Sequence, residues 1–403
     1  MITSVNMLKL LKYYFTLLPE CIFLLIWLGI QCYLFTDTFT GFKKNPSFAS
    51  TNALTGSGVA LAKACASVIN FNAAVLVGSM CRIGLSWLKR IPIINFIFPI
   101  DRYLQLHRVS SISIGLFSLI HTIAHYVNYS KIPTSWFSLA VITGPGATGH
   151  VLWLTLILIT MTSFIKKIKR WKFEVFWYCH YVSFAFLLVL SFHGAFCFVK
   201  RDSPPDCPGA KTWKWLIGPV SFFILELLIK TLRSRRFTFI SKVIIHQSDV
   251  VEVQIKKPSF IYKPGQYVQL KCPEVSLLQW HPFTITSAPE EGFISLHIRA
   301  VGDWTKKFSM RLGAKFDEKS GKLWNYEAPE QLPDILIDGP YGSVSENYDK
   351  FEVAICIGAG IGQTPFSSIL KSIWYSLTHP YNSLKLKKVL FVQISKEIQV
   401  NLI

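Results

Sequence analysis

Five histidines lie in two long apolar stretches of the sequence, where their spacing could support redox chemistry. His107, His121 and His125 fall in residues 104–127, and His180 and His193 fall in residues 174–199. Histidine inside a membrane helix is costly and usually functional. His107 and His121 are 14 residues apart and His180 and His193 are 13 apart, so each helix would carry two imidazoles about 20 Å apart. The 13-residue spacing brings its two histidines less closely onto one face of the helix than the 14-residue spacing does.

Both stretches run outward through the membrane, so we expect His107 to meet His180 and His121 to meet His193. Each pair could clamp one metal ion from opposite sides. Bis-imidazole ligation of haem iron fits, because haem takes axial histidines and is apolar enough for a bundle core. Two haems about 20 Å apart would carry electrons across a hydrocarbon core about 30 Å thick. The alternative for a single membrane histidine is an interhelical hydrogen bond.

Two further polar residues are expected near the outer haem. Lys63 interrupts the second apolar stretch near its outer end, and His125 lies one turn beyond His121. Both could stabilise a developing anion there, which makes them the candidate catalytic residues. The alternative for Lys63 is snorkelling to the membrane surface.

The elements that position these residues are membrane helices. The chain has 403 residues and a net charge of +19; 51% of its residues are hydrophobic and 16% are charged. That composition excludes a disordered chain. Nucleic acid is not an expected partner, because the positive charge lies between apolar stretches. The six predicted spans are residues 13–35, 57–83, 104–127, 150–166, 174–199 and 213–231.

Basic residues follow the second, fourth and sixth spans, and the alternate loops are poor in Lys and Arg. The positive-inside rule therefore predicts that both termini are cytosolic. Loop 194–212 would then lie outside, where Cys197 and Cys207 could form a disulfide or remain two free thiols.

Residues 238–300 alternate apolar and polar side chains in short runs, which predicts a small antiparallel β-barrel. Two motifs stand out in it: His281, Pro282, Phe283 and Thr284, then His297, Ile298 and Arg299. An Arg with a His on one strand can hold a pyrophosphate, and hydroxyls near a Pro-fixed turn can bond a flavin ring. The alternative for the second motif is a basic surface strand.

Residues 351–357 predict a buried parallel strand, and residues 388–394 predict the next strand. A glycine-rich turn follows the first strand, and Thr364 and Pro365 suit the N-cap and first position of a helix that runs to about Tyr375. Such a turn at a helix N-terminus binds phosphate, although a plain tight turn is the alternative. The candidate phosphate-binding residues are Gly358, Gly360, Gly362, Thr364 and Pro365.

Together these residues resemble the catalytic subunit of the NADPH oxidase family, of the phagocyte flavocytochrome b type within the ferric reductase superfamily. The resemblance is most specific in residues 120–125, 173–178, 281–291, 301–305, 338–342 and 358–366. It implies that His107, His121, His180 and His193 ligate two b-type haems. It also implies that residues 281–284 and 297–299 bind FAD and residues 358–365 bind NADPH. Electrons would pass from NADPH through FAD and both haems to dioxygen, giving superoxide on the far side.

The resemblance completes the expected architecture. Residues 1–234 would form a six-helix transmembrane haem domain, 235–345 an FAD-binding β-barrel and 346–403 a partial α/β NADPH-binding domain. Such a protein would lie in a membrane, most simply the plasma membrane, in contact with lipid. Cytosolic activators and a small membrane subunit are the family's partners, and the sequence has no EF-hand loop for direct calcium control.

Three departures from the family are visible. Lys63 stands where these proteins tend to carry Arg, and Gln363 stands where an apolar residue is usual. The similarity fades after about residue 390, which predicts a truncated nucleotide domain. A ferric-chelate reductase and a truncated, non-catalytic haem subunit remain the alternative functions.

Overall fold

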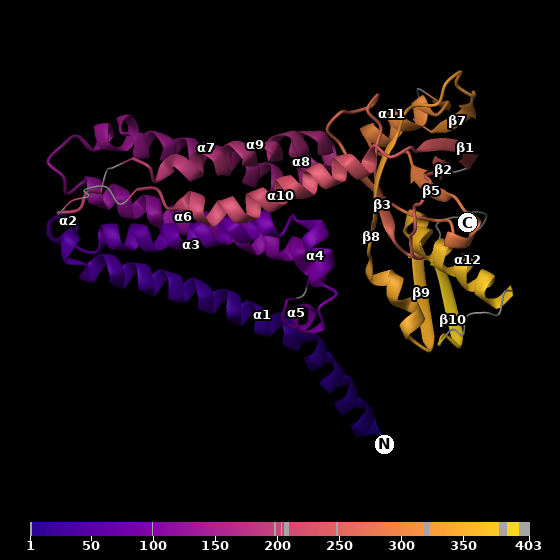
Figure 1. Cartoon of the computed structure of the whole chain (residues 1–403), viewed down its shortest axis with the longest axis horizontal. Helices are drawn as coiled ribbons and strands as arrows, with labels where there is room; N and C mark the ends of the chain where they lie inside the picture. Colours follow the sequence, from indigo (N-terminus) through magenta and orange to yellow (C-terminus); the bar gives the residue numbers. More distant parts are fainter. Residues whose placement is uncertain are drawn as a thin grey trace. The chain divides into compact units, whose positions relative to one another are not determined.

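The computed structural model describes residues 2–98, 100–196, 199–202, 204, 209–246, 249–317, 322–378 and 385–394. The chain divides into two compact units, Met1–Glu226 and Leu227–Ile403. The first is helical and the second is built from strands with two helices (Figure 1).

Long helices make up the first unit. Its helices are α1 (Ile2–Lys44), α2 (Ala49–Thr55), α3 (Gly58–Gly78), α4 (Arg82–Leu88), α5 (Pro92–Ile97), α6 (Tyr103–Tyr129), α7 (Gly144–Phe164), α8 (Lys166–Trp171), α9 (Phe173–His193) and most of α10 (Thr212–Ser234). Helix α3 packs against both α1 and α6, and α7 packs against α9. The fully buried Ala60, Ala62, Ala64 and Ala73 on α3 allow this close approach, as small residues do between membrane helices.

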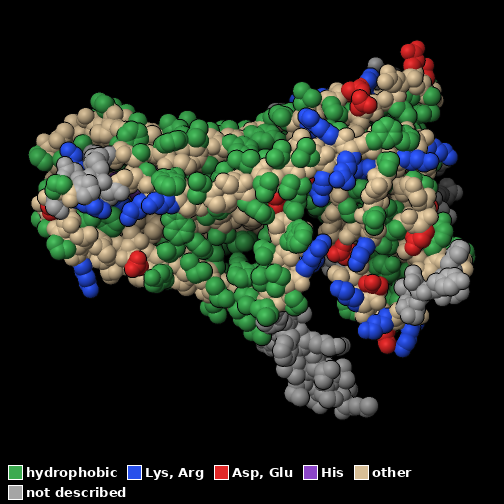
Figure 2. Space-filling model, in the orientation of Figure 1, with side chains coloured by type: hydrophobic (Ala, Val, Ile, Leu, Met, Phe, Trp, Pro, Cys, Tyr) green, Lys and Arg blue, Asp and Glu red, His purple; other side chains and the backbone are tan. Residues whose placement is uncertain are grey.

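Six helical segments in the described residues are long and apolar enough to cross a membrane: Cys21–Lys44, Gly58–Gly78, Tyr103–Tyr129, Gly144–Phe164, Phe173–His193 and Thr212–Ser234. The predicted spans are confirmed in number and order. The first lies further along the chain than predicted, because α1 continues without a break to Lys44. Hydrophobic side chains cover much of the visible face of this unit (Figure 2), as expected of a lipid-facing surface.

Local sequence explains the helix ends. Thr143 precedes Pro145, and its hydroxyl accepts a hydrogen bond from the Gly146 backbone N–H (3.3 Å), so α7 begins there. Helix α4 begins where the Glu226 carboxylate of α10 accepts hydrogen bonds from the backbone N–H groups of Ile83 (3.1 Å) and Gly84 (2.7 Å). An acidic side chain suits that end of a helix.

The second unit holds two three-stranded antiparallel sheets. One has the order β1 (Phe239–His246), β2 (Val250–Lys256), β5 (Ile294–Arg299); the other has the order β4 (His281–Thr284), β3 (Tyr267–Lys271), β8 (Leu336–Tyr341). The smaller pieces are helix α11 (Asp303–Arg311) and the paired strands β6 (Ala314–Phe316) and β7 (Leu323–Tyr326). The antiparallel strands were expected, but among the described residues their pairing does not close a barrel.

Alternation along the strands builds the core of this unit. Val251, Val253 and Ile255 on β2 are fully buried with Leu296 and Ile298 of β5 and Phe308 of α11. The intervening side chains of β2 and β5 therefore lie on the opposite face of that sheet.

Strands β9 (Val353–Ala359) and β10 (Lys388–Ile394) pair in parallel, as predicted, and α12 (Thr364–Thr378) connects them. The expectation that the first of them is buried is wrong for the described residues: Val353, Ile355 and Ile357 are 52%, 62% and 59% exposed. The sheet has two strands there, and these three side chains share the face that no described element covers.

Candidate functional site

The five membrane histidines lie on two helices, α6 and α9, and their rings meet in pairs. The ring centroids of His107 and His180 are 6.1 Å apart, and those of His121 and His193 are 6.2 Å apart. An imidazole nitrogen lies about 1.1 Å from its ring centroid and binds a transition metal at about 2.0–2.1 Å, so two rings on opposite sides of one ion have centroids about 6.3 Å apart. Both separations would leave room for one metal ion between the two rings.

Hydrogen bonds orient three of these four rings. His121 Nδ1 lies 2.8 Å from the Ala62 carbonyl oxygen and so donates to it. His107 Nδ1 lies 3.2 Å from Ser79 Oγ, and His193 Nδ1 lies 2.8 Å from Thr148 Oγ1. Both hydroxyls already donate to backbone carbonyls.

Each of those hydroxyls has a single hydrogen, so it must accept from the histidine. All three rings are then protonated at Nδ1, and Nε2 keeps its lone pair. That is the tautomer of a metal-ligating histidine whose other nitrogen is held by the protein.

A buried polar site adjoins the outer pair. The His125 ring lies 4.7 Å from the His121 ring, edge to face, and its Nδ1 is buried with no hydrogen-bond partner. One turn on, both amide atoms of the buried Asn128 also lack partners. Lys63 interacts electrostatically with both His121 and His125. The site therefore has unused hydrogen-bonding capacity and a lysine amine that interacts with its histidines.

Asn128 was missed by the sequence analysis. Its only signal there is its position three residues after His125, on the same face of α6. The structure adds that a Cβ at Gly58 would clash with Asn128 Oδ1, so any other residue at position 58 would displace this amide.

The first predicted flavin motif forms β4. The His281 ring stacks on Trp304 of α11 with a centroid distance of 4.0 Å, and its Nε2 lies 3.2 Å from Gln279 Oε1. Burial lowers the pKa of His281 to about 4, so the ring is neutral at pH 7. Phe283 packs against the core, Thr284 is half-buried and Pro282 is exposed.

The second motif lies on β5, where the three side chains have different surroundings. Ile298 is in the core, His297 is buried on the opposite face, and Arg299 is exposed. Both ring nitrogens of His297 face protein groups, Nδ1 at 2.8 Å from Thr286 Oγ1 and Nε2 at 3.6 Å from Glu252 Oε2. Arg299 is therefore the member of this motif most open to an external anion.

The glycine-rich turn joins β9 to α12. Gly358 lies close to Gln363, since a Cβ at Gly358 would lie 3.0 Å from Gln363 Cγ, and Gly360 has a φ of +51°. Gly362 lies in the short 3-10 turn Gly360–Gln363. Thr364 is not the predicted N-cap: it has helical dihedral angles, and its hydroxyl donates to the Ile361 carbonyl (3.0 Å). Pro365 occupies the first turn of α12, which continues to Thr378 rather than Tyr375.

Hydrogen bonds and an ion pair join helix α12 to the turn that follows β4. The hydroxyls of Ser367 and Ser368 donate to the carbonyls of Thr286 (3.3 Å) and Ser287 (2.6 Å). Lys371 pairs with Glu291 at 3.3 Å. The helix that follows the glycine-rich turn is thus held to residues 286–291, just after the first predicted flavin motif.

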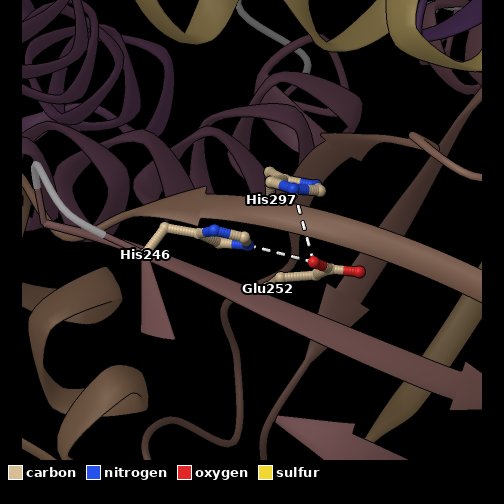
Figure 3. Close-up of side chains that lie close together, drawn as sticks. All are labelled: His246, Glu252 and His297. Carbon is tan, nitrogen blue, oxygen red and sulfur yellow. Dashed lines mark hydrogen bonds and ion pairs between the residues drawn. The ribbon is translucent and has the colours of Figure 1, made fainter. Parts of the chain in front are cut away.

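Four further residues complete the comparison between the sequence predictions and the structure. Cys197 and Cys207 lie outside the described residues. His246 and Glu252, which lie beside His297 (Figure 3), were not singled out. The alternation of β2 could have found Glu252, because it lies between the core residues Val251 and Val253 and must face away from the core.

Comparison with known proteins decides the family. Residues 64–191 match the ferric reductase like transmembrane component and residues 236–345 match an FAD-binding domain. The chain is 33% identical to NADPH oxidase 1 of Mus musculus, over 93% of the chain and 72% of that protein. It is 33% identical to NADPH oxidase 3 of Homo sapiens, over 93% of the chain and 76% of that protein. The chain belongs to the NADPH oxidase family.

A relative from a distant organism shows the same match. The chain is 37% identical to a superoxide-generating NADPH oxidase heavy chain of Dictyostelium discoideum, over 90% of the chain and 71% of that protein. With its six spans and the ferric reductase transmembrane match, this NADPH oxidase family member is an integral membrane protein.

Proposed function

We propose that the chain is a membrane oxidoreductase that passes electrons from cytosolic NADPH through FAD and two b-type haems to dioxygen, producing superoxide on the far side of the membrane. Family membership supports the overall reaction. The electron path is supported by the two histidine pairs, which lie at two levels of the same two helices. Their ring centroids are 6.1 and 6.2 Å apart.

His107 and His180 would hold the inner haem, and His121 and His193 the outer one. The ring orientation imposed by Ser79, Ala62 and Thr148 supports these roles, because it leaves Nε2 free to ligate. Haem and FAD supply the one-electron and hydride chemistry when they are bound. The protein fixes their positions and excludes water from the bundle.

Lys63 and His125 are the residues we assign to the reduction of dioxygen. An oxygen molecule that gains one electron becomes an anion, and a fixed positive charge stabilises it most where water is excluded. The unpartnered His125 Nδ1 and the unpartnered amide of Asn128 provide polar atoms that could bind such an anion in the same place.

On the cytosolic side, we assign residues 281–284 and 297–299 to FAD. Arg299 is exposed and His281 and Thr284 are half-buried, so these are the polar members that a ligand could reach, whereas Phe283, His297 and Ile298 shape the strands beneath. Residues 358–365 would receive the phosphates of NADPH, and the hydrogen bonds from α12 to the segment 286–287 would hold that turn near the flavin.

Topology and organisation follow from the same assignment. The basic segments after the second, fourth and sixth spans support the assignment of both termini to the cytosol, and the plasma membrane is the compartment we propose. Residues 1–234, 235–345 and 346–403 would be the haem, FAD and NADPH domains. Cytosolic activators and a small membrane subunit would be its protein partners.

An anaerobic visible spectrum of the purified protein, reduced first with NADPH and then with dithionite, tests the proposal. We expect a b-type haem spectrum with both reductants, two haems per chain, and superoxide formation when oxygen is admitted. A haem signal with dithionite alone would refute electron entry from NADPH in this chain. No haem with either reductant would refute the four-histidine assignment.

Variants separate the two halves of the proposal. His193→Leu should reduce the haem content from two to one per chain and abolish superoxide. The control His150→Leu changes an exposed ring on α7 that bonds Tyr126 (3.1 Å), so it should retain both haems. Equal haem content in the two variants would contradict the outer site. Lys63→Met should retain both haems but lower superoxide production, and Lys63→Arg should restore part of it.

A further inference from the structure

Three side chains converge on the face of the β1–β2–β5 sheet that points away from the core. His246 comes from β1, Glu252 from β2 and His297 from β5 (Figure 3). Glu252 Oε2 lies 3.0 Å from His246 Nε2 and 3.6 Å from His297 Nε2, and the three ligand atoms lie within 4.8 Å of one another. The strand register explains the meeting, because Glu252 pairs directly with His297 in the ladder.

The atoms that face away from the centre of this cluster are held by other groups. Glu252 Oε1 accepts hydrogen bonds from Ser295 Oγ (2.8 Å) and Gln254 Nε2 (3.0 Å). His297 Nδ1 lies 2.8 Å from Thr286 Oγ1. Outer hydrogen bonds of this kind fix the ligands of a metal site and leave one atom of each free. Here the atoms that face the centre are Glu252 Oε2 and the two Nε2 nitrogens, and His246 Nε2–H donates a hydrogen bond to Oε2.

The tautomer of His297 directs a lone pair at the centre of the cluster. The Thr286 hydroxyl donates its single hydrogen to the Ser295 carbonyl (2.9 Å), so it must accept from His297 Nδ1–H. Neutral His297 then directs the Nε2 lone pair towards Glu252 Oε2, 3.6 Å away, so a cation between these two acceptors would bind both.

We propose that His246, Glu252 and His297 bind a divalent transition-metal ion of the Zn²⁺ class. Two imidazoles and one carboxylate are a known zinc donor set. Ligands about 2.0–2.1 Å from a tetrahedral ion lie roughly 3.4 Å from one another, and the observed 3.0 and 3.6 Å separations lie on either side of that value. The His246 side chain is 26% exposed, which leaves that side open for a water molecule as the fourth ligand.

The ion would not take part in the electron path proposed above, because zinc has no redox chemistry; it would act on structure. It would join β1 and β2 to β5, the strand that carries Arg299 and accepts the hydrogen bond of the Thr286 hydroxyl, and so stabilise the sheet that we assign to FAD.

Metal analysis of the purified full chain tests the proposal. The tag-free protein is stripped with a chelator, equilibrated with Zn²⁺ at pH 7, desalted and analysed for zinc by mass spectrometry, which distinguishes zinc from haem iron. We expect one zinc per chain and an X-ray absorption spectrum with nitrogen and oxygen ligands near 2.0 Å. Less than about a tenth of a zinc per chain would overturn the proposal.

Two ligand variants and a control locate the ion. His246→Gln and Glu252→Gln should each weaken zinc binding at least 100-fold, since losses of 10- to 100-fold are typical even for outer-shell partners. His150→Gln, which removes a histidine on α7, should bind zinc as the wild type does. Equal binding by all four proteins would mean adventitious zinc and overturn the assignment.

Measuring the unfolding temperature distinguishes a variant that has lost the zinc site from one that is misfolded. Added Zn²⁺ should raise the unfolding temperature of the stripped wild type and of His150→Gln, because a ligand that binds the folded state stabilises it. It should leave those of His246→Gln and Glu252→Gln unchanged. A zinc-dependent rise of the same size in the ligand variants would refute the site.

Discussion

Removing the guanidinium of Arg233 should destabilise the flavin-binding unit by about 3 kcal/mol. Asp338 on β8 is fully buried, and its Oδ1 accepts from Arg233 Nε (3.0 Å) and Nη2 (2.6 Å). In Arg233→Met the carboxylate would lose both bonds. Breaking a buried ion pair costs about 3–5 kcal/mol, and the low end applies because the Arg233 side chain is 35% exposed and Lys257 also interacts with the carboxylate.

Hydrogen exchange of the full chain, read by mass spectrometry, measures this effect locally. A loss of about 3 kcal/mol should accelerate exchange of the β3 and β8 amides about 100-fold, at 1.36 kcal/mol per tenfold change. Adding Asp338→Asn to Arg233→Met should recover part of the loss, because no uncompensated charge remains. The control Arg311→Met breaks an exposed pair with Glu274 and should cost less than about 1 kcal/mol. Equal exchange in the two single variants would refute the reasoning.

Three further predictions rest on other contacts. Lowering the pH from 6.5 towards 4 should lower the unfolding temperature of the second unit. Burial brings the pKa values of His281 and His297 to about 4, so the unfolded chain binds more protons in that range; an unchanged midpoint would contradict this. Gly313→Ala should lower the unfolding temperature more than Gly302→Ala. Gly313 has a φ of +99°, and its added Cβ would clash with the Glu327 carbonyl oxygen, whereas a Cβ at Gly302 has nothing closer than 3.8 Å. Glu226→Gln should accelerate exchange in α4 about tenfold, because an amide cannot accept both bonds of the capping carboxylate; exchange equal to that of the wild type would show that the cap is dispensable.

The sequence was sufficient for the membrane half because the bilayer constrains it strongly. A span needs about 20 apolar residues, so the six helices could be counted directly, and a histidine in such a span needs a reason to be there. The pairing of His107 with His180 followed from helix direction alone. The ends of the helices did not follow, because the apolar pattern continues beyond them: α1 extends to Lys44, past the predicted end at residue 35.

The fold of the soluble half was less predictable, because the surroundings of each strand come from segments that are distant in the sequence. The alternation of β2 and β5 predicts which side chains leave the core, yet it does not predict what covers the opposite face. The burial of Val353 was predicted from composition alone and was wrong, since only the packing of neighbouring elements decides it.

Because the surroundings of a strand come from other segments, residues 297–299 support two assignments. A period of two puts His297 and Arg299 on one face of β5, and the sequence therefore gives them a shared ligand. In the structure they differ: Arg299 is exposed, whereas both nitrogens of His297 face Thr286 and Glu252. An anion at Arg299 and a cation beside His297 need not compete, because each meets a different part of the strand. A His297→Gln variant that loses zinc but retains FAD would separate the two assignments, whereas loss of both would show that the sheet depends on the ion.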